Sequence, residues 1–266
     1  MLNFNAHLGF QFTEKTFLKR FEAAASAGFS AVEFPAPYDH EASLLSDLLQ
    51  EHQLTMVQFA APVGLTKGLA AATSRDAEFK AGLAEAVDYA KQLKCSNVHL
   101  MSGINIPGAL NTDGQTYLGN LRYAVDYLAD NGLSGLIEVI STAEMPGYYL
   151  SSFDVAMPAL EAVPQLGLIL DIYHTQLVSG DSLGILNQLI DRVHHVQVAD
   201  WPGRHEPGTG QLEFGKIFRF LENSGYDGWI GCEYRPLIAT NEGLGWLNKW
   251  GVIPKSGLRS PMKNSF

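Results

Sequence analysis

The chain has 266 residues, of which 46% are hydrophobic and 17% are charged, and its formal net charge is −10. This composition is typical of a globular protein with a sizeable core, and the acidic excess argues against a nucleic-acid partner, whose phosphates are bound by Lys and Arg. Cys95 and Cys232 form neither a disulfide framework nor a metal-binding spacing. Without a secretion signal or an apolar stretch long enough to span a bilayer, we expect a cytoplasmic protein with no membrane partner.

Short apolar runs alternate with amphipathic segments along nearly the whole chain. Between the runs, apolar residues recur at steps of three and four, as at Phe79, Leu83 and Val87, which predicts helices that each bury one side. Eight such strand-helix units predict a single α/β domain, a parallel (β/α)₈ TIM barrel, and the Gly-rich phosphate loops typical of doubly wound sheets are absent from the sequence. The expected strands are residues 3–8, 31–34, 54–61, 97–101, 135–140, 166–173, 193–199 and 227–234.

The predicted barrel domain covers residues 1–250, because no Pro-, Gly- or Ser-rich linker divides the chain. Residues 251–266 lack hydrophobic periodicity and contain three basic residues and no acidic one. We therefore expect this segment to be a loosely ordered C-terminal tail.

Four consecutive strands end on an acidic or amide residue inside an apolar run: Glu138, Asp171, Gln197 and Glu233. Helices cover the outer face of a barrel strand, so we expect these side chains to point into the mouth of the barrel, where this fold carries its reactive groups. Any single one can instead be a strand-end residue that bonds a loop amide. Four in phase favour a shared site, in which neighbouring carboxylates need a cation and oxygen ligands favour Mg²⁺ or Mn²⁺.

The geometry of an eight-stranded barrel also separates two of these acids. Glu138 belongs to the fifth expected strand and Glu233 to the eighth, and these strands stand nearly across the barrel from each other. The two carboxyl groups can therefore approach a bound substrate from opposite sides, one taking a proton and the other returning it.

Five segments carry a family resemblance: GFSAVEF, IEVISTAEMPGYYL, LDIYHTQ, HVQVADWPGRHEPGTG and GWIGCEYRP. Together they resemble the hydroxypyruvate isomerase family, within the wider group of xylose isomerase-like TIM barrels. The resemblance implies that Glu138 and Glu233 are the acid/base pair, and that these two bind the divalent metal together with Asp171 and Gln197. It also implies a small anionic substrate, faced by Glu144, His174, Arg204 and His205.

The implied reaction is the metal-assisted isomerisation of hydroxypyruvate to tartronate semialdehyde, with proton transfer through an ene-diolate. A 2-oxo-tetronate isomerase and a keto-sugar 3-epimerase are the alternatives with the same two glutamates. A barrel that binds a sugar acid without turnover is an alternative of another class. A nuclease for damaged DNA would require several His zinc ligands and a basic groove, which the sequence does not show. Homo-oligomerisation is left open.

The sequence departs from the family pattern at three places. Val139, Ile140 and Ser141 replace family residues after the fifth strand, and a later segment of the family pattern reads QLEF here. The loop after the third strand is shortened to PVGLTKGLAAATSR. Lys67 in this loop is either a replacement cation that binds the substrate or a solvated lysine. His7 and His99 lie where they can reach the mouth of the barrel or pack in the core.

Overall fold

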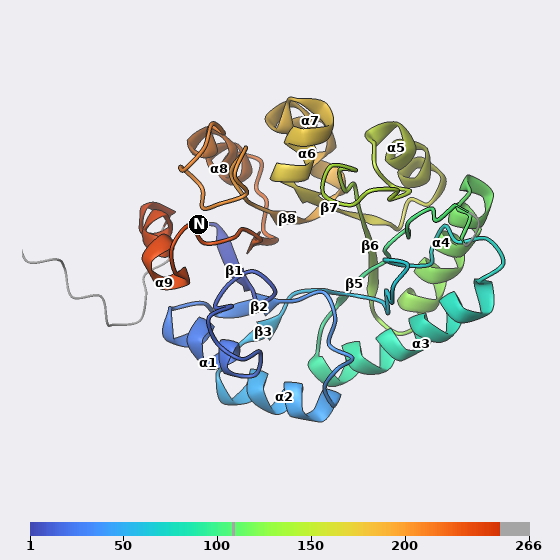
Figure 1. Cartoon of the computed structure of the whole chain (residues 1–266), viewed down its shortest axis with the longest axis horizontal. Coiled ribbons are helices and arrows are strands. Elements are labelled where there is room, and N and C mark those ends of the chain that lie inside the picture. Colours follow the sequence, from blue (N-terminus) through green and yellow to red (C-terminus); the bar gives the residue numbers. More distant parts are fainter. Residues whose placement is uncertain (108–109, 251–266) are drawn as a thin grey trace, which may run out of the picture.

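The strands of the chain pair in parallel, edge to edge, around a central axis (Figure 1). The computed structural model describes residues 1–107 and 110–250, and within these the sheet runs in the order β3-β2-β1-β9-β8-β7-β6-β5-β4. The strands are β1 Asn3–His7, β2 Ala31–Glu33, β3 Thr55–Met56, β4 Phe59–Ala60, β5 Asn97–His99, β6 Ser134–Glu138, β7 Gly167–Asp171, β8 Val193–Gln197 and β9 Trp229–Cys232.

The two ends of this order, β3 and β4, are halves of the single strand expected at residues 54–61. Strand β3 pairs with β2 and strand β4 with β5, so the segment from 55 to 60 closes the ring. Between them, the Val57 amide donates to the Val32 carbonyl at 3.0 Å, and the Asn97 side chain donates to the Val57 carbonyl at 3.0 Å. The predicted (β/α)₈ barrel is confirmed, with its third strand interrupted at Gln58.

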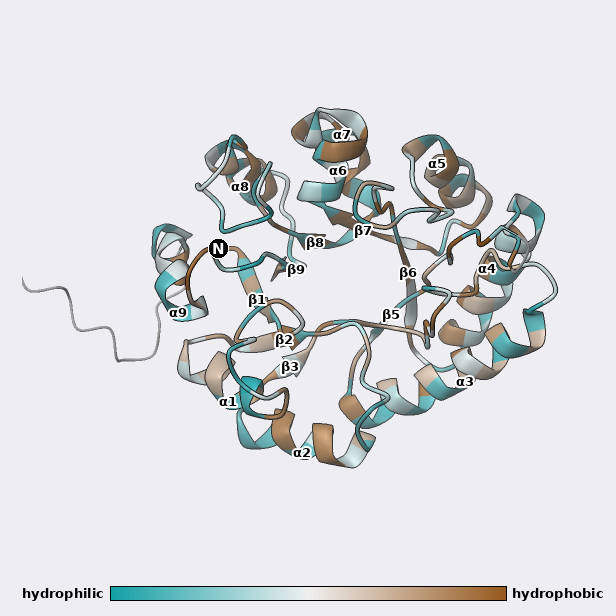
Figure 2. Cartoon of the chain, viewed as in Figure 1, coloured by the Kyte–Doolittle hydropathy of each residue, from teal (hydrophilic) through white to brown (hydrophobic). Residues whose placement is uncertain are grey.

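Helices surround the ring of strands, and hydrophobic residues lie along the strands and on parts of the helices (Figures 1 and 2). The predicted stripe of Phe79, Leu83 and Val87 is buried on α3. Helices connect consecutive strands, as parallel pairing requires; α6 and α7 together join β7 to β8, and α9 follows the last strand. The helices are α1 Lys19–Ser26, α2 Ala42–Glu51, α3 Asp76–Leu93, α4 Gly114–Ala129, α5 Phe153–Ala162, α6 Ile172–Ser179, α7 Ser182–Leu189, α8 Phe214–Asn223 and α9 Thr240–Gly243, with 3₁₀ turns at η1 Ile190–Arg192 and η2 Leu244–Trp250.

In residues 1–107 and 110–250, no helix has both the length and the hydrophobicity needed to cross a membrane. The tail expected at residues 251–266 lies outside the described part of the chain.

Part of the barrel interior is polar rather than hydrophobic. Glu33 on β2 is fully buried, and so is His195, which lies two residues before Gln197 and therefore on the same face of β8. Gly231 on the neighbouring β9 leaves the space that these side chains use: a Cβ at this position would overlap Glu33 Oε1 and lie 3.1 Å from His195 Nε2. The absence of a side chain at Gly231 thus makes room for the buried contact between Glu33 and His195.

We predict that Gly231→Ala lowers the free energy of unfolding by about 1–3 kcal/mol, because the added methyl group overpacks a site whose polar neighbours are held in place. Urea denaturation measures this difference. Gly119→Ala is the matched control, since this exposed α4 glycine has open space around its Cβ position and alanine favours the helix by about 0.5–1 kcal/mol. Equal stability of Gly231→Ala and the unaltered protein would contradict the prediction.

Candidate active site

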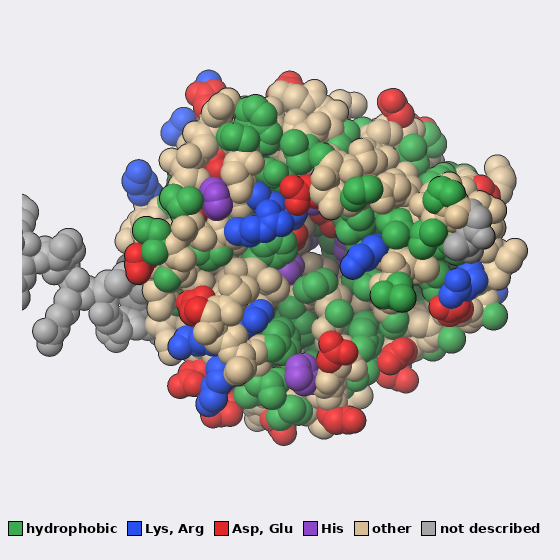
Figure 3. Space-filling model, viewed as in Figure 1, with side chains coloured by type: hydrophobic (Ala, Val, Ile, Leu, Met, Phe, Trp, Pro, Cys, Tyr) green, Lys and Arg blue, Asp and Glu red, His purple; other side chains and the backbone are tan. Residues whose placement is uncertain are grey.

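Four strand ends bring oxygen-bearing side chains to one end of the barrel. Glu138, Asp171 and Gln197 are the last residues of β6, β7 and β8, and Glu233 directly follows β9. Glu138, Gln197 and Glu233 line a cavity of about 290 Å³, and the fully buried side chain of Asp171 lies beside it. Figure 3 shows acidic, basic and histidine side chains around the hollow at the centre of this face. The predicted convergence of the four strand ends is therefore observed.

The two oxygens of Asp171 have different surroundings. Oδ1 accepts hydrogen bonds from the amides of Tyr173 at 2.7 Å and His174 at 3.2 Å, and so caps the N-terminus of α6. Among the residues that the structure describes, Asp171 Oδ2 and Gln197 Oε1 are buried without any hydrogen-bond partner. Buried oxygens of this kind normally have a donor or a cation beside them. These two atoms therefore fit a divalent ion.

Burial raises the pKa values of both glutamates above their usual range. Burial, followed by the charges of Glu233 and Asp171, raises the pKa of Glu138 well above its usual range. Burial likewise raises the pKa of Glu233, although Arg204 opposes this shift. Two coupled carboxyl groups with raised pKa values can act as acid and base near neutral pH.

Each glutamate has a buried histidine beside it. His7 Nε2 lies 3.6 Å from Glu233 Oε2, and His99 Nδ1 lies 3.8 Å from Glu138 Oε2. Burial lowers the pKa of His7 to about 4 and that of His99 to about 3, so both rings are neutral at neutral pH. The Gly9 amide donates to His7 Nδ1 at 3.1 Å, which leaves the proton of the neutral ring on Nε2, facing Glu233. Both histidines line the cavity, so they reach the mouth of the barrel, which was one of the two positions expected from the sequence.

Arg204 supplies the positive charge among these acids. Its Nη2 donates to Glu233 Oε1 at 2.7 Å and lies 3.6 Å from Asp171 Oδ2, while Nη1 donates to Glu144 Oε2 at 3.0 Å. Its guanidinium carbon lies 4.9 Å from the centroid of the Phe10 ring. Burial disfavours the charged guanidinium, but the three surrounding carboxylates outweigh it and raise the pKa of Arg204.

Asp200 shapes the loop that carries Arg204. One oxygen of Asp200 accepts from the amides of Gly208 at 2.8 Å and Gly210 at 2.9 Å, and the other accepts from Leu212 at 3.0 Å. The Arg204 amide donates to the Asp200 carbonyl at 2.8 Å. The backbone of Arg204 has a φ of 55°, a left-handed conformation that is uncommon for residues other than glycine and that these bonds maintain.

The same loop is joined to the segment after β9. The Arg235 amide donates to the Arg204 carbonyl, and His205 Nδ1 donates to the Arg235 carbonyl, both at 2.8 Å. The buried carboxylate of Glu206 accepts from the Leu237 amide with both oxygens, at 3.0 and 3.1 Å. The two loops are therefore one hydrogen-bonded unit.

Of the residues expected to face the substrate, Glu144, His174 and Arg204 line the cavity. His205 is half-buried against the backbone of Arg235, and Lys67 is exposed, so the structure places neither in the described cavity lining. Their roles toward the substrate stay predictions.

Two residues of the site had no place in the sequence interpretation. Asp200 organises the loop, and the signal was present in the sequence as an aspartate followed by a glycine-rich turn. Glu33 lies in a three-residue strand, and the sequence gives no sign of which side chains it meets.

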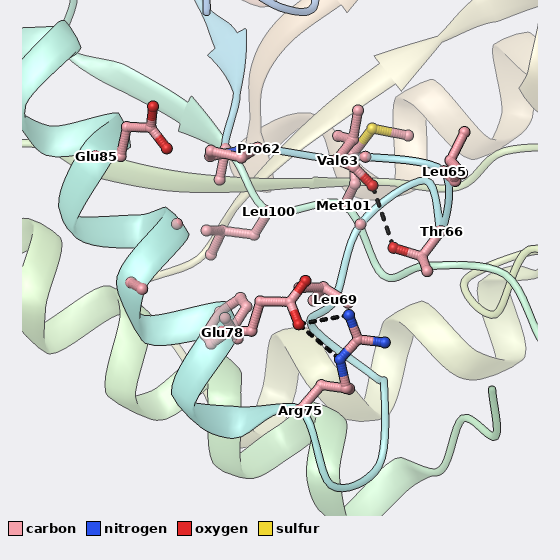
Figure 4. A pocket seen from close by; sticks show the side chains of 16 residues that line it. Pro62, Val63, Leu65, Thr66, Leu69, Arg75, Glu78, Glu85, Leu100 and Met101 are labelled. Carbon is pink, nitrogen blue, oxygen red and sulfur yellow. Dashed lines mark hydrogen bonds and ion pairs between the residues drawn. The ribbon is translucent and has the colours of Figure 1, made fainter. Parts of the chain in front are cut away.

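A second cavity, of about 590 Å³, lies between the loop after β4 and helix α3 (Figure 4). It is larger than the first, but its charged lining residues are Arg75, Glu78 and Glu85, of which Arg75 and Glu78 are paired with each other. Met101 lines both cavities. The convergent acids, the unpartnered oxygens and the raised pKa values all belong to the smaller cavity, which is therefore the candidate active site.

A family model described as xylose isomerase-like TIM barrel matches residues 21–250. The chain belongs to this family. The 2-oxo-tetronate isomerase of Cupriavidus necator is 40% identical over 258 residues, which cover 94% of this chain and 99% of that protein. The hydroxypyruvate isomerase of Escherichia coli is 36% identical over 258 residues, which cover 94% of this chain and 100% of that protein. The family predicted from the sequence is confirmed, as is the expectation of an isomerase-like enzyme.

Solved structures give the same family and fold. A Brucella melitensis protein, described as an AP endonuclease, family 2, is 39% identical with a TM-score of 0.89, covering 94% of this chain and 99% of that one. The D-allulose 3-epimerase from Methylomonas sp. is 22% identical with a TM-score of 0.70, covering 94% of this chain and 90% of that one. At this lower identity, the likeness shows the fold alone.

We predict that Glu138→Gln stabilises the metal-free protein at pH 8 by about 1–2 kcal/mol. The folded form holds the Glu138 proton more tightly than the unfolded form does. The favourable contribution of the Glu138 proton to the free energy of unfolding is therefore complete below about pH 4.3, the pKa of glutamate in the unfolded chain. This contribution is lost as the pH rises through the higher pKa of Glu138 in the folded protein. Glutamine has no charge to lose, so the two proteins converge in stability near pH 4.

Urea denaturation of chelator-treated protein between pH 4 and pH 8 measures this difference. Glu78→Gln, at an exposed acid that lines the second cavity, is the control and should follow the pH dependence of the unaltered protein. A Glu138→Gln variant that is less stable than the unaltered protein at pH 8 would contradict the electrostatic account.

Proposed function

We propose that the protein is a metal-assisted isomerase that moves a proton between neighbouring carbons of a small 2-oxo or hydroxy acid, with Glu138 and Glu233 as the acid/base pair. The observation that carries the proposal is that the buried Glu138 and the partly exposed Glu233, both with raised pKa values, face one small cavity, beside the unpartnered oxygens of Asp171 and Gln197. A base needs a carboxylate, and an acid needs a carboxyl group that keeps its proton near pH 7. Two coupled groups provide both forms.

The residues that would hold the divalent ion are Glu138, Asp171, Gln197 and Glu233, and oxygen ligands favour Mg²⁺ or Mn²⁺. One oxygen or nitrogen from each of Glu138, Asp171 and His174 already lies within 4.8 Å of the others, and Glu233 forms a second such group with His7 and Glu33. Arg204 Nη2 contacts both Asp171 and Glu233, so the two groups adjoin. When bound, the ion would polarise the substrate carbonyl and stabilise negative charge on the neighbouring oxygens.

The protein groups divide the remaining work. One of the two glutamates removes the proton from the hydroxyl-bearing carbon of the substrate, and the other delivers a proton to the former carbonyl carbon. The hydroxyl proton passes to the former carbonyl oxygen, which becomes the new hydroxyl group. The neutral Nε2–H of His7 faces Glu233 and stabilises its ionised form. Burial of both glutamates excludes bulk water, which limits proton loss from the ene-diolate between the two transfers.

An anionic substrate of three or four carbons fits this cavity. Its volume of about 290 Å³ is at the lower end for small-molecule sites. Arg204 and Arg235 both line it, and a guanidinium binds a carboxylate with two parallel hydrogen bonds. The names of the relatives, 2-oxo-tetronate isomerase and hydroxypyruvate isomerase, support acids of this size.

The cellular setting follows the sequence expectations. We infer a cytoplasmic enzyme that has no nucleic-acid or membrane partner, and the net charge of −10 supports the lack of a nucleic-acid partner. Homo-oligomerisation stays open.

We predict that the Mg²⁺- or Mn²⁺-loaded protein in D₂O introduces deuterium at the reacting carbon of hydroxypyruvate or of a 2-oxo-tetronate, with formation of the aldose-type isomer. Proton NMR of the substrates follows the exchange. Glu138→Gln and Glu233→Gln should each lower turnover by about 10²–10⁴-fold, because each removes one proton-transfer group.

Glu78→Gln serves as the matched control with full activity. Normal turnover in either Glu138→Gln or Glu233→Gln would disprove the two-glutamate mechanism. Exchange with ketohexoses in place of both acids would move the activity to keto-sugar 3-epimerisation, and exchange with none of them would favour a non-catalytic sugar-acid-binding barrel.

We also predict that Arg204→Lys raises the KM for the acid substrate by about 10-fold or more, because lysine provides one point charge where arginine provides a planar pair of donors. Steady-state kinetics on the active substrate measures this change. Arg219→Lys, at an exposed position of α8, is the control and should leave KM unchanged. An unchanged KM in Arg204→Lys would remove Arg204 from substrate binding.

A further inference from the structure

Beside the candidate site, Glu33 is surrounded by side chains from other strands. Gln58 Nε2 donates to Glu33 Oε2 at 2.8 Å, and Gln197 Nε2 donates to Glu33 Oε1 at a longer 3.4 Å. His195 Nε2 lies 2.7 Å from Glu33 Oε2, a short contact that is poorly aligned for a hydrogen bond. All four residues are buried, and Glu33 and His195 have no exposed surface. This cluster is therefore sealed from solvent on the β2 side of the barrel.

The cluster fixes the orientation of two side-chain amides. A carboxylate offers only acceptors, so the amide groups of Gln58 and Gln197 must turn their NH₂ ends toward Glu33. The carbonyl ends are then directed away from it. In the described chain, Gln58 Oε1 and Gln197 Oε1 are both buried without hydrogen-bond partners, and both glutamines line the candidate site. The opposite rotation of Gln197 would place its Oε1 against an oxygen of Glu33.

Gly231 and Gln58 fix the position of the Glu33 side chain. Gly231 has no side chain, and any Cβ there would overlap Glu33 Oε1. The interruption of the third strand at Gln58 allows this residue to reach Glu33 across the end of β2. A role limited to stability would not account for two carbonyl oxygens left without partners at the edge of one cavity.

We propose that Glu33 is a positioning residue that orients the carbonyl oxygen of Gln197 toward the divalent ion. This inference rests on the proposed function, because it concerns the ion that Glu138, Asp171, Gln197 and Glu233 would hold. In this proposal Glu33 acts through the amide of Gln197 and is not itself a ligand, although one of its oxygens lies within 4.8 Å of a ligand atom of Glu233. Residues that orient metal ligands in this way change metal affinity by about 10–100-fold when they are replaced.

The test is a double-mutant cycle on metal affinity rather than on activity. The full-length protein, Glu33→Gln, Gln197→Ala and the double variant are freed of metal and titrated with Mn²⁺, and electron paramagnetic resonance reports the free ion. Glu33→Gln should weaken Mn²⁺ binding by about 10–100-fold. In the Gln197→Ala background, the same change should weaken binding by less than about 2-fold, because the residue through which Glu33 acts is gone.

Glu33→Asp separates the hydrogen bond from the charge. It keeps the carboxylate but withdraws it by one methylene group, so we expect Mn²⁺ binding to weaken by about 5-fold or more while the net charge stays the same. This milder replacement also covers the case in which Glu33→Gln does not fold. Asn120→Ala is the control. Asn120 on α4 is buried and donates to the Ala70 carbonyl, so its loss should lower stability and leave Mn²⁺ affinity unchanged.

The outcomes distinguish the two proposals. If the unaltered protein binds no divalent ion, the metal-assisted function and the role of Glu33 both fail. If it binds Mn²⁺ and Glu33→Asp binds equally well, only the role of Glu33 fails. Equal weakening by Glu33→Gln with and without Gln197 would also overturn the inference, because it would show that the charge of Glu33 acts on the ion directly.

Discussion

Repulsion among buried carboxylates is the constraint on which this site depends. Glu138 and Asp171 are buried at the ends of β6 and β7, and the partly exposed Glu233 lies beside them, where like charges cannot all stay ionised without a counter-charge. Arg204 supplies this counter-charge and contacts Asp171 and Glu233 directly. Burial first, and repulsion second, raise the pKa values of the two glutamates. The placement that costs stability therefore also gives these groups a capacity for proton transfer.

Because Arg204 supplies the positive charge for these acids, its side chain must be held in position as rigidly as the residues of the strands. It comes from a loop rather than from the barrel, and the loop is held by the Asp200 carboxylate and by backbone bonds. The aromatic face of Phe10 and the carboxylate of Glu144 complete its surroundings. Sites on loops reach the precision of strand-borne sites only when polar contacts of this kind replace the sheet hydrogen bonds.

The sequence was sufficient for the fold and for the convergence of the four strand-end residues, because alternation and helix cover leave only one tolerable direction for Glu138 or Asp171. The family resemblance implied that Glu144, His174, Arg204 and His205 face the substrate, and the first three line the cavity. The sequence does not show where Lys67 or His205 lies, since loop conformation depends on bonds to residues distant in sequence, as between His205 and Arg235. Nor could it reveal the break in the third strand or the neighbours of Glu33, which are set by pairing with other strands.

The joining of the loops after β8 and β9 has a consequence for evolution and engineering. Arg204, His205 and Glu206 all bond backbone groups of the segment at 235–237, so neither loop keeps its conformation alone. Replacing only one of these loops with that of a relative would leave the Glu206 carboxylate buried without the Leu237 amide. It would also remove the hydrogen bond from the Arg235 amide to the Arg204 carbonyl. The two loops therefore depend on each other in sequence. A change of specificity should be transferable between homologues only when both loops are exchanged at the same time.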